Sequence, residues 1–169
     1  AKYRNRSHKF LWAYSTRWGC QLLSLSRAQL PIILARMDAE TWLDQLLARL
    51  DETGPVGQSA REYLRQRKIN VSLHAQPTGA RWTARGHIEL HPSYAEPRDD
   101  AYALSLVVHE VRHLQQGWFT ALSVQGELEG WHVQFAFLKS LTGRYHSDPK
   151  LDHIVAELMS LPLSDRAAL

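Results

Sequence analysis

The chain contains 169 residues, 44% of them hydrophobic, which is enough for one globular domain over 1–169 with a substantial core. Its single cysteine, Cys20, excludes an internal disulfide, and no apolar stretch approaches the length of a membrane span. We therefore expect a protein without a transmembrane segment in a reducing, cytoplasmic compartment, although the absence of an initiating Met leaves room for a removed leader.

The N-terminal segment is strongly basic within a formal net charge of +3. Every charged residue before Asp38 is Lys or Arg, and Trp12 and Trp18 lie among them. Such a segment could bind nucleic acid or an anionic surface, or could remain from a targeting peptide. The interpretation that we prefer is the solvated face of a helix that packs through apolar residues between 10 and 18.

The rest of the N-terminal part, up to residue 68, is expected to be mainly helical. Asp38 is a suitable cap for a helix that ends at Thr53-Gly54-Pro55, and Ser59-Ala60-Arg61-Glu62 has the form of a capping box that begins a second helix. The apolar run Pro31-Ile32-Ile33-Leu34 fits either a buried strand or a helix, since it is too short for its periodicity to decide.

Two or three short antiparallel strands are expected over 69–91. Apolar and polar side chains alternate in Ile69–His74, Arg81–Thr83 and His87–His91, and Arg85-Gly86 favours a turn. A small antiparallel sheet is therefore predicted just before the next helix.

The most informative motif is His109-Glu110-Val111-Arg112-His113. Two imidazoles four residues apart on a helix lie one turn apart on the same face, where they can bind one metal ion. Glu110 lies at the flank of that face, which suits a general base acting on a metal-activated water. The alternative is that both histidines are ordinary surface or hydrogen-bonded core residues.

The helix that carries the motif is predicted over about 98–116. Its apolar residues recur every three or four positions and form one stripe: Leu104, Val107, Val108, Val111 and Leu114. His109, His113 and Gln116 lie on another side, so the two histidines are not simply part of the core.

A third metal ligand is expected on the following helix, which begins near Thr120 and completes a metal-site helix pair over 98–142. The short connection favours antiparallel neighbours, and symmetric pairing about 118–119 makes Glu127 the carboxylate nearest the histidines. Glu129 is the second choice as a ligand, or else a carboxylate that orients a ligand histidine.

These residues, with Gly130 three positions after Glu127, resemble the gluzincin branch of the zincin metallopeptidases, including minimal single-domain members and uncharacterised bacterial zincin-like domains. The resemblance covers roughly 86–142. It implies an α+β, zincin-like fold in which a small antiparallel sheet packs on an active-site helix and a following ligand helix, with extra N-terminal helices. It also implies one Zn²⁺ per chain bound by His109, His113 and Glu127, with Glu110 as the general base.

Three further features bear on this resemblance. Arg112 occupies a position that is usually uncharged in zincin helices. Trp131 stands where many gluzincins carry an acidic residue that supports a ligand histidine, which leaves that partner unassigned. His87–His91 resembles the zincin edge strand that binds the substrate backbone, although an ordinary hairpin is the alternative.

Catalytic candidates beyond the motif are Tyr145 and His153, which could stabilise the oxyanion, with His146 and His132 as further options. Trp118 and Phe119 are expected to pack rather than to contact substrate. A C-terminal helix is predicted over 148–161, with its apolar residues on a buried side: Leu151, Ile154, Val155 and Leu158.

The function expected is that of a zinc-dependent metallopeptidase that hydrolyses a peptide or protein substrate. The alternative is a non-catalytic zincin-like module that binds metal, a partner or nucleic acid. The sequence leaves the oligomeric state and the cleavage preference open.

Overall fold

The computed structural model describes residues 29–95 and 98–162, and it divides the chain into two units, Ala1–Asp38 and Ala39–Leu169. The interpretation of the basic segment falls on 1–28, outside the described residues. The single domain over 1–169 stays a prediction. The candidate site lies entirely in the second unit, and none of the described helices combines the length and apolarity needed to cross a membrane.

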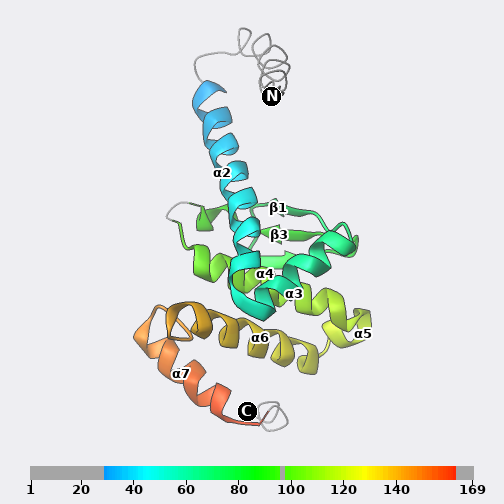
Figure 1. The fold of residues 1–169 in the computed structure, drawn as a ribbon, viewed down its shortest axis with the longest axis vertical. Coiled ribbons are helices and arrows are strands. Elements are labelled where there is room, and N and C mark those ends of the chain that lie inside the picture. The colour runs from blue at the N-terminus through cyan, green and yellow to red at the C-terminus, as the bar shows by residue number, and fades with distance from the viewer. Residues whose placement is uncertain (1–28, 96–97, 163–169) are drawn as a thin grey trace, which may run out of the picture. The chain divides into compact units, whose positions relative to one another are not determined.

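Helix α2 extends over Gln29–Arg49 and is followed by a 3-10 turn, Leu50–Glu52, and by α3, Gly54–Gln66 (Figure 1). The Pro31–Leu34 run is therefore helical, and Asp38 lies inside α2 rather than at its start. Helix α3 begins at Gly54 instead of at the predicted capping box, because Pro55 takes the first turn, where its fixed φ and missing N–H cost nothing.

The sheet contains β1 (Val71–Leu73), β2 (Ala80–Trp82) and β3 (Ile88–Leu90) in the order β1-β3-β2. β2 pairs antiparallel with β3, but β1 pairs parallel with it, so the expectation of an entirely antiparallel sheet is wrong. The alternating pattern predicts which residues form strands, but not that β3 inserts between the two earlier ones. As a result β3 is central and β2 is an edge strand.

Four helices follow the sheet: α4 (Asp100–Gln116), α5 (Trp118–Ala121), α6 (Val124–Thr142) and α7 (Pro149–Ser160). The motif helix α4 has Asp99 as its cap, whose side chain accepts a hydrogen bond from the Tyr102 N–H. Instead of one helix from Thr120, the chain forms the short α5 and then α6, which Ser123 caps. The described chain is thus an α+β protein with six helices and a three-stranded mixed sheet.

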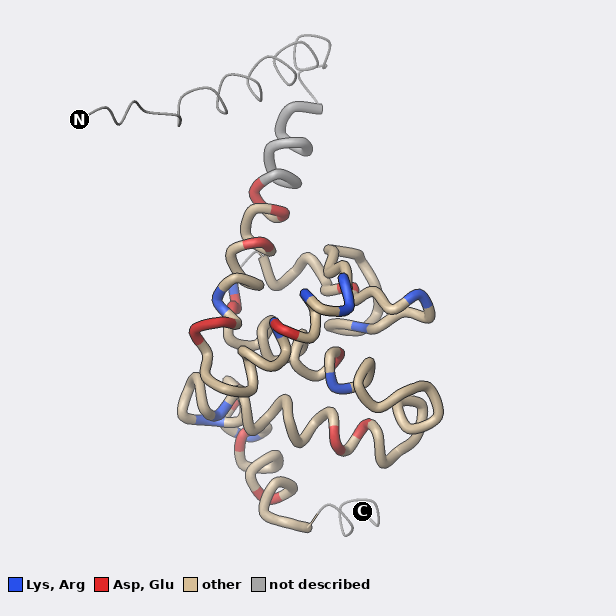
Figure 2. Tube along the Cα trace, turned by 45° about the vertical axis from the view of Figure 1, so that its right-hand side comes forward, with Lys and Arg blue, Asp and Glu red and all other residues tan. Residues whose placement is uncertain are grey.

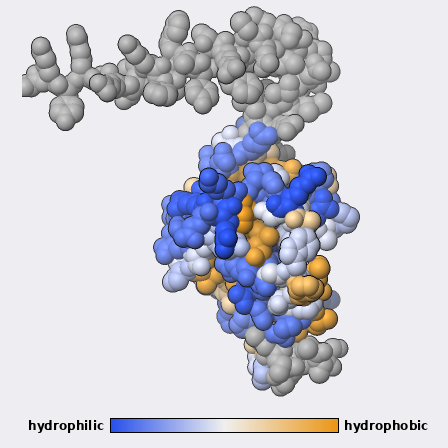
Figure 3. All heavy atoms as spheres, turned by 90° about the vertical axis from the view of Figure 1, so that its right-hand side faces the viewer, coloured by the Kyte–Doolittle hydropathy of each residue, from blue (hydrophilic) through white to orange (hydrophobic). Residues whose placement is uncertain are grey.

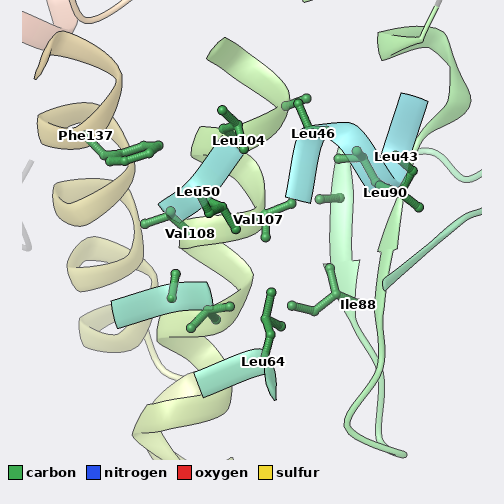
Figure 4. Close-up of a cluster of buried hydrophobic side chains, with 14 of the residues drawn as sticks. Leu43, Leu46, Leu50, Leu64, Ile88, Leu90, Leu104, Val107, Val108 and Phe137 are labelled. Carbon is green, nitrogen blue, oxygen red and sulfur yellow. The ribbon is translucent and has the colours of Figure 1, made fainter. Parts of the chain in front are cut away.

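The core lies around α4, between the sheet on one side and α6 on the other (Figure 4). It includes side chains from every layer: Trp42, Leu46, Leu50, Leu64, Ile88, Leu90, Leu104, Val107 and Phe137. The buried side predicted for α7 is wrong, because no residue of α7 is buried and its Leu151 and Ile154 are 44% and 57% exposed. The rigid element in this packing is therefore α4, which carries the motif.

Candidate metal centre

Three side chains from two helices converge on one point beside the core. His109 and His113 project from α4, and their Nε2 atoms lie 2.8 Å apart. Glu127 reaches them from the first turn of α6, with one carboxylate oxygen 3.7 Å from His109 Nε2 and the other 3.4 Å from His113 Nε2. The ligand atoms all lie within 4.8 Å of one another. This group could hold a metal ion.

The state of the two histidines fits that role. Both are buried, and burial followed by the neighbouring His113 lowers the pKa of His109 from 6.5 to about 4. Neutral imidazole is the form that binds a metal. Two neutral rings that point Nε2 at each other can share only one proton between them, whereas a cation there can accept both lone pairs. Two nitrogens and a carboxylate suit zinc and related transition metals.

Gly130 lets α6 approach His109 closely. A Cβ at this position would lie 2.8 Å from His109 Cε1, too close for any real contact. Gln134, one turn further along α6 and buried, faces the same ring, and both Gln134 and the Gly130 backbone oppose the lowering of the pKa of His109. Neither gives His109 Nδ1 a hydrogen bond of normal geometry. The helix is thus in contact with the ring rather than merely near it.

Replacing Gly130 by Ala should weaken metal binding without loosening the helix. Ala is a better helix former than Gly by about 1 kcal/mol, so a loss of affinity at this buried position cannot come from helix propensity. The added methyl group would displace the His109 ring and lower zinc affinity by at least about tenfold. Chelator competition measures this affinity and circular dichroism monitors the fold. Unchanged affinity in a folded variant would show that position 130 does not constrain His109.

A polar network holds His113. Its Nδ1 lies 3.2 Å from Gln116 Oε1, and Gln116 Nε2 donates to Glu129 Oε2 at 3.0 Å. The same carboxylate accepts hydrogen bonds from Arg112 at 2.6 Å and from Gln125 at 3.2 Å. The bond from Gln116, followed by that from Arg112, lowers the pKa of Glu129. Glu129 therefore lies at the end of the network that orients His113, and it accounts for the unusual charge of Arg112.

Glu110 is a buried carboxyl group beside the two histidines, only 5% exposed. Burial raises the pKa of Glu110 from 4.5 to about 7, and the charge of Glu127 adds to this rise. A hydrogen bond with the backbone of Trp82, on β2, opposes it. The carboxyl group is thus held between the motif helix and the edge strand.

The metal-free protein should show the pKa of Glu110 in its stability. The fold favours the neutral form of the Glu110 carboxyl group. This group therefore adds its full contribution to the free energy of unfolding below pH 4.5, and the contribution is lost as the pH rises through 7. His109 acts oppositely over much of this range, so the wild-type profile is partly cancelled. Glu110→Gln separates the effect of Glu110 from that of His109. The free energy of unfolding of this variant, relative to that of wild type, should grow by up to ~3 kcal/mol between pH 4.5 and 8. Urea unfolding with chelator present measures this, and a difference independent of pH would contradict it.

The site opens into a pocket of ≈ 410 Å³. Its lining comes from the β2 segment and from α4 and α6, and includes Thr78, Gly79, Ala80, Arg81, Trp82, Tyr102, Leu106, Glu110, Trp131, Gln134 and Phe135 beside the three metal-site residues. Structural zinc sites are usually closed by four protein ligands. Among residues 29–95 and 98–162 three converge here, and the Glu127 side chain, which lines the pocket, is 47% exposed. The site has room for a small molecule or a peptide segment.

The edge strand of the sheet forms one wall of this pocket. Backbone hydrogen bonds from His91 to Gly79 and from Thr83 to His87 fix the pairing of β2 with β3. The alternation of antiparallel pairs then directs the backbone groups of Ala80 and Trp82 away from β3. The expectation that His87–His91 is the edge strand is wrong, because β3 is central and β2 takes that place.

The structure does not bring Tyr145 or His153 to the pocket. Tyr145 Oη accepts a hydrogen bond from Lys139 Nζ at 3.1 Å, and His153 is 76% exposed and pairs with Glu157. Their sequence positions after α6 suggested proximity, but neither residue is in the pocket lining: Tyr145 lies in the connection between α6 and α7, and His153 lies on α7. His146 packs edge-on against Tyr102, with ring centroids 5.9 Å apart. His132, on α6, does not line the pocket.

The structure adds Tyr102 and Gln134, which sequence reasoning missed. Both line the pocket with the metal-site residues. Tyr102 precedes His109 by seven residues and Gln134 follows Glu127 by seven, which is two helical turns. Extending the helical periodicity from the ligands would have found both residues.

Comparisons with protein-family models, with curated proteins and with solved structures find no match for this chain. The argument for function therefore depends on the motif and on the site described above.

Proposed function

We propose that this protein is a zinc-dependent metallopeptidase of the gluzincin type. The observation that carries the proposal is the convergence of His109, His113 and Glu127 in a pocket that also holds the buried carboxyl group of Glu110. Zinc bound there would act as a Lewis acid toward a carbonyl group and would lower the pKa of a coordinated water to about 7.

Each residue of the site has a role that follows from its position. His109 and His113 supply neutral nitrogens, and Glu127 supplies a negative charge from the solvent side of the site. Glu110 accepts a proton from the attacking water and passes it to the leaving amine, since it adjoins both histidines and is shielded from bulk water. On the outer edge of β2, Ala80 O accepts a hydrogen bond from Thr78 Oγ1 and the Trp82 backbone bonds Glu110, so an extended peptide would pair with the outward groups that remain.

The pocket favours catalysis over a purely structural metal. A structural site needs no further carboxyl group buried beside its three ligands, because burial of that group costs stability when it ionises. Groups of this kind are concentrated at functional sites. The three residues that would hold zinc adjoin the pocket, which would leave room for the water or substrate that a catalytic zinc needs.

Hydrolysis of a reduced, carboxymethylated and therefore unfolded protein tests the proposal. We expect zinc-loaded protein to release defined fragments, chelator to stop their release, and added zinc to restore it. Mass spectrometry identifies the fragments, and a heat-inactivated sample controls for contaminating peptidases. Failure of zinc-loaded, folded protein to cleave any bond would contradict the proposal.

A further inference from the structure

An exposed apolar surface lies beside the candidate site. Among the described residues, five of the eight most exposed large apolar side chains fall between 118 and 131, and we call them the apolar patch: Trp118, Phe119, Leu122, Val124 and Trp131. Phe119 is 97% exposed and Leu122 is 72% exposed. The expectation that Phe119 packs is therefore wrong. Apolar groups gathered in this way mark interaction surfaces.

The apolar patch continues into the pocket. The Trp118 ring lies edge-on to Trp82, with centroids 5.1 Å apart, and Trp82 lies 6.5 Å from the His113 ring. Trp82 and Trp131 both line the pocket. Figure 3, which faces the α5 side of the molecule, shows apolar areas within the otherwise polar surface. Whatever binds the patch therefore also borders the metal-site residues.

The surrounding charges distinguish a polypeptide from a lipid surface as the occupant. No charged residue occurs from Leu114 to Gly126, and the next charged residues are the carboxylates Glu127 and Glu129. Figure 2 shows the chain around α5 without charged positions. Segments that bind anionic membranes flank their apolar residues with Lys or Arg. Arg112 precedes this stretch and Arg81 lines the pocket, but each is paired with a carboxylate, Glu129 and Glu89, whereas the β2 edge suits an extended chain.

We propose that the apolar patch binds a segment of the polypeptide substrate that carries large aromatic or aliphatic side chains, next to the bond that is cleaved. The inference depends on the proposed peptidase function. An extended chain paired with β2 places alternate side chains on the same side. Side chains on the Trp82 side would meet Trp118, which packs against Trp82 and begins the segment that continues to Phe119 and Leu122. The substrate class is thus an unfolded or extended polypeptide rich in large apolar residues.

Selection of random dodecapeptides on phage tests this inference, with zinc-loaded Glu110→Gln protein as bait so that bound peptides are not cleaved. Peptides with large apolar residues should be enriched. The double variant Phe119→Ser/Leu122→Ser should bind the selected peptides about tenfold or more weakly, since each side chain loses apolar contact area. Leu151→Ser/Ile154→Ser on α7 is the matched control, because these residues are also exposed and apolar but belong to another helix and not to the apolar patch. The control should bind as tightly as the bait.

Several results would overturn the inference: no enrichment of apolar peptides, full affinity in the patch variant, or an equal loss in the α7 control. A second assay measures sedimentation of the protein with vesicles of phosphatidylcholine and phosphatidylserine. If only the patch variant loses vesicle binding, and its peptide binding is unchanged, the patch would be assigned to a membrane instead. Zinc content and hydrolysis are measured separately with Glu110 intact. Peptide binding that persists in a protein without zinc or hydrolysis would reject the peptidase function while retaining the patch as a peptide site.

Discussion

Replacement of Glu110 by Gln is expected to remove nearly all peptide hydrolysis and to leave metal binding intact. Gln keeps the shape of the side chain in a position that is 5% exposed, but it has no carboxylate to accept a proton. General-base catalysis typically contributes 10²- to 10⁴-fold, so kcat should fall by at least about 100-fold. Steady-state kinetics on a peptide identified from the unfolded-protein digest measures this fall.

Two controls make the Glu110→Gln result specific. Glu157→Gln makes the same chemical change on α7, at a side chain that is 71% exposed and pairs with His153, and it should not change kcat. Zinc content of Glu110→Gln should equal that of wild type, because Glu110 is not among the three converging ligands. A Glu110→Gln enzyme that keeps more than about a tenth of the wild-type kcat would show that another group takes the proton.

Replacement of Glu127 by Ala should cost far more zinc affinity than replacement of Glu129. Glu127 approaches both histidines to 3.4 and 3.7 Å, so its loss leaves two neutral ligands in a buried site. Glu129 acts through Gln116, and partners of this kind typically contribute 10- to 100-fold in metal affinity. We expect a loss of more than about 100-fold for Glu127→Ala and a smaller one for Glu129→Ala.

Competition with a chromogenic zinc chelator compares the two carboxylate variants in one assay. Both positions are on the first two turns of α6 and both variants introduce Ala, so helix propensity cancels between them. The reverse order, with Glu129→Ala losing more affinity, would assign the ligand to Glu129. Equal and small losses of zinc affinity in the two variants would show that neither carboxylate is a zinc ligand.

The sequence predicted the motif helix well because the relevant geometry is local. The i, i+4 spacing alone places His109 and His113 on one face, and the short connection to the next helix is enough to favour Glu127 over Glu129. The strands over 69–91 and the helix after them were predicted from the change of periodicity, and the resemblance to zincins implied the α+β class. These features depend on helix and strand repeats, which do not change with tertiary context.

The wrong predictions concern contacts between distant parts of the chain. The alternating pattern of β1 is the same whether it pairs parallel or antiparallel, so it could not show that β3 inserts in the middle. The amphipathic pattern of α7 does not reveal that Leu151 and Ile154 stay exposed and that Val155 and Leu158 are only half-buried. Tyr145 and His153 were chosen for their closeness in sequence to α6, but the direction of the chain after Gly143 decides where they lie.

The strand that borders the pocket could not be predicted from the sequence, because it depends on the order of the strands in the sheet. A hairpin after residue 79 was expected, but only the order β1-β3-β2 makes β2 the strand that borders Glu110. Residues 117–120 were expected to form a short connection between two helices. The structure instead has the short helix α5 there, which exposes Phe119 next to the site. Both features depend on tertiary packing.

Anomalous X-ray diffraction at the zinc absorption edge, from crystals of the full chain grown with zinc, tests the central claim most directly. The account predicts one strong peak per chain at roughly 2.0 to 2.2 Å from His109 Nε2, His113 Nε2 and a Glu127 oxygen. Absence of a peak there, or a peak coordinated by other residues, would contradict the metal centre and with it the proposed peptidase.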